Sequence, residues 1–259
     1  MLEHDDIQHF LLTRPRALAA RYGFLTIRNA AEGRAWLSGI IDKVGTGQVV
    51  ATGASVDTRW VTVAFTWNGL RALGLDEPSL AAFPDEFRQG MAARAAVLGD
   101  TGANHPDHWV GGVASPDLHA IVILFARDVA ERKRVTHEHT EFLARTPGVR
   151  VLSSLDLDAI PPFDYAHEHF GYRDRISEPV IEGTDIQPKP GSGAAIKAGE
   201  FILGYPDESG EPVVLPKPEI LFRNGTYMAY RRLQEHVGAF REFLRQNGKT
   251  AAEQELWPS

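Results

Sequence analysis

Hydrophobic positions along the chain fall into four short segments with the composition of β-strands. The third of them, Leu118 to Ala126, is apolar at both odd and even positions, which is typical of a central strand covered on both faces. Trp60 to Trp67 is rich in β-branched and aromatic residues, and Tyr22 to Arg28 alternates apolar residues densely enough for a buried strand. The fourth segment is Val149 to Leu155. We therefore predict four strands in the first 160 residues.

Helical patterns separate these strands. Asn29 followed by Glu32, and Asp128 followed by Glu131, are capping-box signatures that predict two helix starts. The first helix then places apolar residues on one face, and the second is expected to stop at Pro147-Gly148.

Additional helices are predicted between the second and third strands. Asn68 is expected to cap a short helix, and Pro84 to open another that runs to about Leu98. The core order is therefore strand, helix, strand, strand, helix, strand. This is the ferredoxin-like α+β arrangement, one antiparallel sheet with helices on one face.

A second, shorter set of elements follows a linker rich in glycine, proline and serine at 185–199. It consists of a short strand at 200–204, a strand from Tyr227 to Arg231, and a helix with apolar residues from Leu233 to Leu244 on one stripe. Too few strands follow for an independent sheet. We expect a ferredoxin-like domain at 1–184, a linker at 185–199, and the beginning of a second, truncated ferredoxin-like domain at 200–259.

The composition of the chain excludes several classes of partner and of cofactor chemistry. Charged residues sum to a net charge of −7, which argues against nucleic acid or an anionic membrane as a partner. No apolar run approaches about 18 residues, and the acidic N-terminus does not resemble a secretory signal. The chain has no cysteine, so disulfides, thiolate haem ligands and iron–sulfur clusters are excluded. A cytoplasmic location is expected.

The stretch from His169 to Thr184 has neither helical nor strand periodicity and is predicted to be an ordered loop. Within it, Asp174 lies between Arg173 and Arg175, whose positive charges favour the ionised carboxylate. From the residues alone, this loop fits a surface turn with an Arg–Asp pair better than it fits a functional site.

The same loop resembles the GxxDG haem-pocket motif of the dye-decolourising (DyP-type) peroxidases, in the form FGxRDxISxPxIxG, over Phe170 to Gly183. Arg175 stands where that family usually has the second glycine. Five further stretches resemble the family in order and spacing: Asp6 to Gln8, Phe65 to Gly74, Gly199 to Pro206, Arg223 to Tyr227 and Arg231 to Leu233.

The resemblance implies a dimeric α+β barrel fold and a peroxidase that uses haem b. Asp174 would be the distal acid–base residue, which accepts a proton from hydrogen peroxide and returns it. Small aromatic reductants such as dyes and phenols would be oxidised one electron at a time. The residues expected to line the haem are Arg173, Arg175, Ile176, Ser177, Pro179 and Gly183.

The family's proximal histidine lies in its second half, for which this chain has no counterpart, so the resemblance does not identify an iron ligand here. An alternative function is therefore a haem-free ferredoxin-like binding or assembly module derived from that family. An incomplete second unit also favours either a homo-oligomer or a missing C-terminal half as partner.

Histidine pairs offer the remaining candidate chemistry. His137 and His139 point about 200° apart on a predicted helix, so we expect both to be solvated rather than to chelate one ion. His167 and His169 could share a face in a non-helical run, but no second cluster of ligands accompanies them. No metal site is predicted.

Overall fold

The protein is described from a computed structural model that covers residues 1–12, 17–47, 61–158, 179–184, 186–188, 193–211 and 213–248. It divides into two units, each described by itself. The first consists of Met1–Asp158 and Pro179–Ala229, and the second of Ala159–Glu178 and Tyr230–Ser259.

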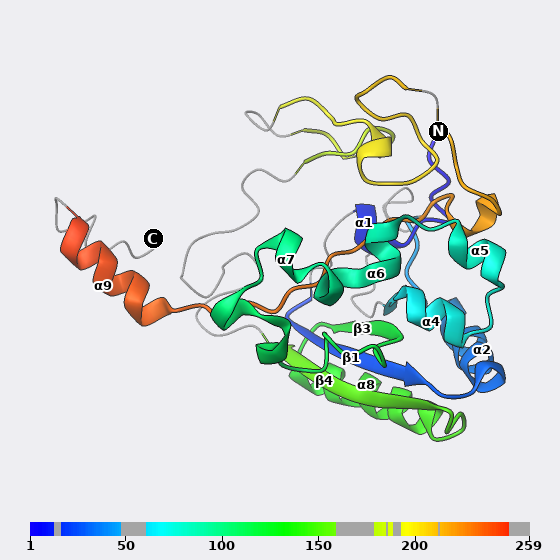
Figure 1. Cartoon of the computed structure of the whole chain (residues 1–259), viewed down its shortest axis with the longest axis horizontal. Helices are drawn as coiled ribbons and strands as arrows, with labels where there is room; N and C mark the ends of the chain where they lie inside the picture. Colours follow the sequence, from blue (N-terminus) through cyan, green and yellow to red (C-terminus); the bar gives the residue numbers. More distant parts are fainter. Residues whose placement is uncertain are drawn as a thin grey trace. The chain divides into compact units, whose positions relative to one another are not determined.

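The first unit is built on a four-stranded antiparallel sheet (Figure 1). Its strands are β1 (Ala19–Ile27), β2 (Val61–Phe65), β3 (Ala120–Ala126) and β4 (Val149–Asp158), in the order β2-β3-β1-β4. Every residue of β3 is buried, as its apolar pattern predicted. This strand order and the intervening helices confirm the predicted ferredoxin-like fold.

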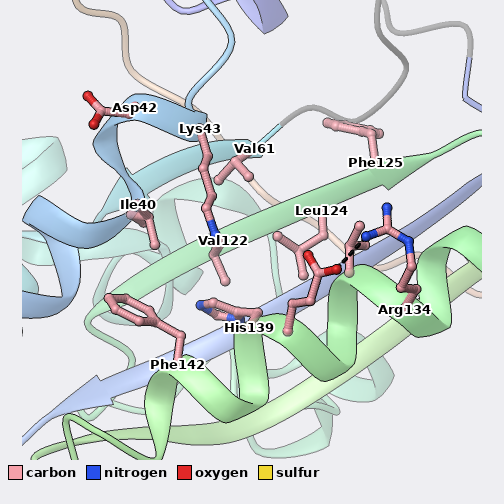
Figure 2. A pocket seen from close by; sticks show the side chains of 12 residues that line it. Ile40, Asp42, Lys43, Val61, Val122, Leu124, Phe125, Arg134, His139 and Phe142 are labelled. Carbon is pink, nitrogen blue, oxygen red and sulfur yellow. Dashed lines mark hydrogen bonds and ion pairs between the residues drawn. The ribbon is translucent and has the colours of Figure 1, made fainter.

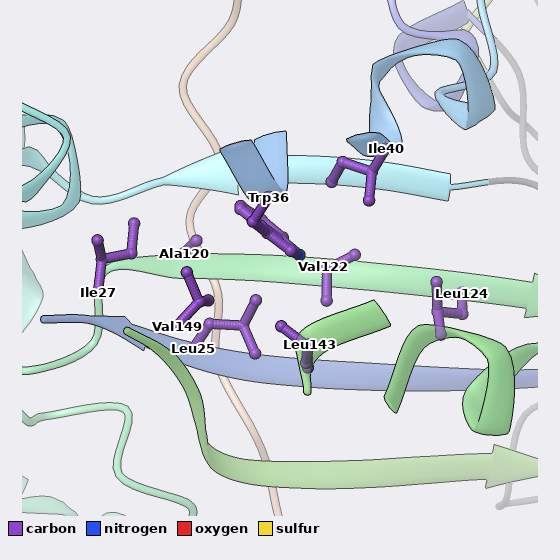
Figure 3. Packing of buried hydrophobic residues seen from close by; sticks show 9 residues of the cluster. All are labelled: Leu25, Ile27, Trp36, Ile40, Ala120, Val122, Leu124, Leu143 and Val149. Atoms are coloured by element: carbon purple, nitrogen blue, oxygen red, sulfur yellow. The ribbon is translucent and has the colours of Figure 1, made fainter. Parts of the chain in front are cut away.

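Helices α2 (Ala30–Ile40) and α8 (Val129–Leu143) pack on one face of the sheet. Nine buried residues form the core between them and the strands (Figure 3): Leu25, Ile27, Trp36, Ile40, Ala120, Val122, Leu124, Leu143 and Val149. Full burial of residues of this size contributes roughly 1.5–3 kcal/mol each, so this layer supplies much of the driving force for folding.

Both predicted helix starts are confirmed, although neither forms a reciprocal capping box. Asn29 Oδ1 accepts a hydrogen bond from the Glu32 amide at 3.0 Å, but the Glu32 carboxylate accepts from the amide of Gly148 instead of returning to the cap. Glu32 therefore ties the start of α2 to the turn before β4.

The opposite face of the sheet is also covered. Phe24 and Ile123 are 2% and 1% exposed, and Phe125 stacks on Phe10 of the N-terminal arm with ring centroids 5.9 Å apart. Figure 1 shows α6 (Asp85–Ala93) and α7 (Ala95–Leu98) on the side of the sheet away from α8. Both faces of the sheet are thus covered at β1 and β3, although β4 is largely exposed, whereas helices were expected on one face alone.

Two predictions for this region are wrong in detail. The single helix expected from Pro84 to Leu98 is interrupted twice. Gly90, within the bounds of α6, has a non-helical φ of 73°, and Arg94 separates α6 from α7. Asn68 does not cap α4 (Trp67–Ala72); Thr66 does, since its Oγ1 accepts from the Gly69 amide at 3.0 Å.

The strands expected at 200–204 and 227–231 are not formed. The first segment folds back on itself, because the Gly199 amide donates to the Pro206 carbonyl at 2.9 Å, which makes a compact turn rather than an extended strand. The remaining short elements are α1 (His9–Leu12), α5 (Glu77–Ala81), η1 (Ile41–Lys43), η2 (Gly102–Asn104), η3 (Pro106–His108), η4 (Ala198–Glu200) and η5 (Glu219–Leu221).

In the second unit, α9 (Val237–Asn247) begins after Leu233 and ends before Gly248, where the sequence predicted its end. Among the residues described, none of the helices has both the length and the apolar character needed to cross a bilayer.

Candidate functional site

Most of the predicted haem-loop residues lie outside the described residues, namely Arg173, Asp174, Arg175, Ile176 and Ser177. His167 and His169 lie outside them as well. Of the predicted set, the structure describes Pro179 and Gly183, both exposed. The roles assigned to all these residues stay predictions. The structure does show which contacts hold the two ends of the loop in place.

The upstream end of the loop follows β4, whose last residues are bound by a buried arginine. Arg132 of α8 has a side chain only 7% exposed, and it donates to both carboxylate oxygens of Asp158, at 2.7 and 2.9 Å. It also pairs with Asp156 at 2.6 Å. These bonds raise the pKa of the Arg132 guanidinium, with the Asp158 bond as the largest cause.

Sequence analysis did not single out Arg132. The available signal was the Asp-x-Asp spacing of Asp156 and Asp158, since alternate residues of a strand share a face. Arg21 on β1 completes the cluster, because it donates to Asp156 at 2.9 Å and to Ser154 at 2.7 Å. The strand end that leads to the loop is thus fixed to both α8 and β1.

The downstream end of the loop packs on the N-terminal arm. Ile181 is 6% exposed, and it lies in a cluster with Leu2 and Ile7. Gly183 has a φ of 87°, and a Cβ there would lie 3.1 Å from Leu2 Cγ, so this turn favours glycine. The Gly183 carbonyl oxygen lies 3.1 Å from His4 Nε2, which fits a hydrogen bond.

The same arm binds residues near the end of the first unit. Glu3 accepts from Arg223 Nη2 at 2.5 Å and from Asn224 Nδ2 at 2.7 Å. Asn224 Nδ2 also donates to Asp6 at 2.7 Å, and its Oδ1 accepts from the Tyr205 hydroxyl at 2.6 Å. We call these five residues the arm network.

The arm network joins three stretches that carried the family resemblance: Asp6 to Gln8, Gly199 to Pro206 and Arg223 to Tyr227. Hydrogen bonds from Arg223 and then Asn224 lower the pKa of Glu3 to about 2, so its carboxylate is ionised at neutral pH. Within the first stretch, Gln8 forms two side-chain bonds with the backbone of Val63 on β2, at 2.9 and 3.1 Å.

Two histidines are held inside the protein by hydrogen bonds. His119 Nδ1 accepts from the Ile27 amide at 2.8 Å, as befits a core histidine in a strand. His139 Nε2 accepts from Trp36 Nε1 at 3.2 Å, so the prediction of a solvated His139 is wrong; His137 is exposed, as predicted. A helix can bury one of two i, i+2 positions while exposing the other.

Three described histidines have a ring nitrogen in contact with other protein atoms. His119 Nδ1 accepts from the Ile27 amide, His139 Nε2 accepts from Trp36, and His4 Nε2 lies against the Gly183 carbonyl. In the part of the chain that the structure describes, no three histidine, cysteine, aspartate or glutamate side chains group as metal ligands would.

Comparison with known proteins gives the lineage. The model of the family described as "DyP dimeric alpha+beta barrel domain" matches residues 6–153. Peroxidase 2 of Mycetinis scorodonius is 30% identical over 247 residues, which cover 95% of this chain and 46% of that protein. The chain therefore spans about half the length of the curated relatives it matches.

Solved structures share the fold. A decolorizing peroxidase (DyP) from Auricularia auricula-judae matches with a TM-score of 0.80 at 24% identity, over 98% of this chain and 54% of that one. A dye-decolorizing peroxidase in complex with 2,6-dimethoxyphenol matches with a TM-score of 0.78 at 22% identity, over 95% and 53%. In both, the matched region is about half of the longer protein.

Proposed function

This chain belongs to the DyP family, whose dimeric alpha+beta barrel domain it contains, and from that premise we propose that it is the N-terminal part of a haem-dependent peroxidase. The family match over residues 6–153 is the observation that carries the proposal. The arm network supports it, because stretches that resemble the family far apart in sequence meet through specific side-chain bonds.

In this proposal Asp174 is the acid–base residue. Its carboxylate takes a proton from hydrogen peroxide and later returns it to the departing oxygen. Arg173 favours the ionised form that accepts the proton. When bound, haem supplies the Lewis acidity and the redox capacity that no amino-acid side chain of this cysteine-free chain provides.

The remaining predicted pocket residues would hold or shape the haem edge: Arg173, Arg175, Ile176, Ser177, Pro179 and Gly183. Arg175 is the departure from the family pattern, and its guanidinium suits a haem propionate. Small aromatic compounds are the proposed electron donors, in keeping with the 2,6-dimethoxyphenol bound to a structural relative.

A haemin titration of the 259-residue protein tests the proposal. We expect a one-to-one Soret shift, with a histidine of this chain or of a partner chain as the iron ligand. Turnover of hydrogen peroxide should follow, and Asp174→Asn should lower it at least about a hundredfold, the usual contribution of a positioned acid–base group. Asp107→Asn is the matched control, because it makes the same substitution at an exposed carboxylate outside the loop and should leave turnover unchanged. Turnover that does not depend on Asp174 would contradict its assignment.

A second candidate is the haem-free binding or assembly module. The observation that favours it is that the chain matches about half of the length of its curated relatives, together with Arg175 at a position where the family usually has glycine. Absence of a specific Soret shift in the titration, with the first unit folded by circular dichroism, would favour this module. A tight one-to-one shift with peroxide turnover would exclude it.

A further inference from the structure

A cavity of about 350 Å³ lies on the α8-covered side of the sheet, beside β2 and β3 (Figure 2). Its walls are mainly apolar, and they include Ile40, Val122, Leu124 and Phe142. This volume is at the lower end of the range typical of small-ligand sites, roughly 300–1,000 Å³. The lining therefore favours a compact ligand with an apolar body.

One cation at this cavity has no ion-pair partner among the described residues. Figure 2 shows Lys43 extending from η1 with its ammonium directed toward His139, whereas the carboxylate of Asp42 points away. Arg134, the other cation of the lining, is paired with Glu138. The Lys43 ammonium is therefore available to an anionic ligand.

His139 adds a neutral hydrogen-bonding edge. Because its Nε2 accepts from Trp36 Nε1, the ring proton resides on Nδ1. Burial, together with the positive charges of Lys43 and Arg21, lowers the pKa of His139 to about 4, so the ring is uncharged at neutral pH. His139 can then donate a hydrogen bond without adding a charge.

We propose that this cavity binds a small monocarboxylate with an aromatic or aliphatic body. The carboxylate pairs with the Lys43 ammonium at the mouth, and the body packs on Val122, Leu124 and Phe142. A charge-assisted hydrogen bond to the Lys43 ammonium favours the ionised acid over its neutral amide. This site is independent of the proposed peroxidase function.

Isothermal titration with benzoate, and with benzamide as its uncharged analogue, tests the site at neutral pH. We expect benzoate to bind one-to-one and benzamide to bind at least about tenfold more weakly. Lys43→Met should weaken benzoate about tenfold, because it keeps the length of the side chain and removes the charge. Lys133→Met on the exposed surface of α8 removes the same charge and should leave benzoate affinity unchanged.

Three results would overturn the proposal. They are no detectable benzoate binding at millimolar concentration, equal affinity for benzoate and benzamide, and equal benzoate affinity of the wild type and Lys43→Met. Since Lys43 is exposed and unpaired in the described chain, its replacement is not expected to affect folding, and circular dichroism of both lysine variants checks this.

Discussion

The side-chain amide of Asn224 donates a 2.7 Å hydrogen bond to the carboxylate of Asp6, across 218 positions of sequence. Asn224 is 5% exposed and has a φ of 64°, a left-handed conformation that asparagine tolerates better than most residues. One side chain therefore closes the first unit by linking its N-terminal arm to its last segment.

Replacing Asn224 tests this closure. Asn224→Ala should lower the free energy of unfolding by about 2–3 kcal/mol, because it removes two charge-assisted bonds and places at positive φ a residue that tolerates this conformation less well than asparagine does. Asn224→Gly removes the same bonds without the backbone strain, so it should cost about 1 kcal/mol less. Urea unfolding followed by tryptophan fluorescence measures both. Equal costs for Ala and Gly would show that no strain is present.

Burial of His139 should make stability depend on pH. Its pKa of about 4 in the folded state lies below the usual 6.5, so the unfolded chain binds a proton first as pH falls. The contribution of this residue is fully present above pH 6.5 and is lost as pH falls toward 4. His139→Gln should flatten the pH dependence of urea stability in this window.

His137→Gln provides the control, because His137 is exposed on the same helix. It should leave the pH dependence unchanged. His9 also has its pKa lowered to about 4 by burial, so part of the acid loss persists in His139→Gln. Parallel curves for the wild type and His139→Gln would mean that His139 titrates normally in the folded protein.

Gly69 is fixed by close backbone contact. A Cβ at this position would lie 1.8 Å from the carbonyl oxygen of His119. Neither α4 nor β3 can make room for it without moving. We expect Gly69→Ala to cost more than about 3 kcal/mol, the range of severe overpacking. Gly99→Ala meets nothing within 4 Å and differs only by its φ of 75°, so about 1 kcal/mol is expected. Thermal denaturation compares the two.

Arg132 should be a strong contributor at the end of β4. Arg132→Met leaves the carboxylates of Asp156 and Asp158 close together without their cation, and breaking a fully buried pair costs about 3–5 kcal/mol. Because these carboxylates are 39% and 36% exposed, we expect about 2 kcal/mol. Urea unfolding measures it. Adding Asp156→Asn to Arg132→Met should recover part of the loss, and further destabilisation would contradict the ion-pair account.

Local signals in the sequence predicted the fold well. The cap residues Asn29 and Asp128 are in place because capping depends on atoms three residues away, and β3 is buried because its apolar pattern admits no exposed face. Prediction failed where the conformation of a segment depends on contacts beyond its nearest neighbours in the sequence. Residues 199–206 contain strand-forming side chains, yet a Gly199–Pro206 backbone bond folds them into a turn.

The candidate site was predictable only as a motif. Resemblance to the haem-pocket motif predicted a functional loop around Asp174, whereas the residues that hold the loop ends, Arg132 and Ile181, are recognisable only once the sheet and the arm are assembled. His139 shows the same limit, because helical spacing gave its direction around α8 but not the indole of Trp36 that lies there.

Closure of the arm by Asn224 also sets an order of events during protein synthesis. Translation releases the N-terminus first, and every strand of the sheet has been made by Asp158. The apolar arm residues Leu2 and Ile7 cannot complete their cluster until Ile202 has left the ribosome. The arm gains its hydrogen bond from Asn224 later still. Through that interval the nascent chain presents an apolar N-terminal segment to chaperones. The last contact to form is a slow one, because it joins residues far apart in the sequence.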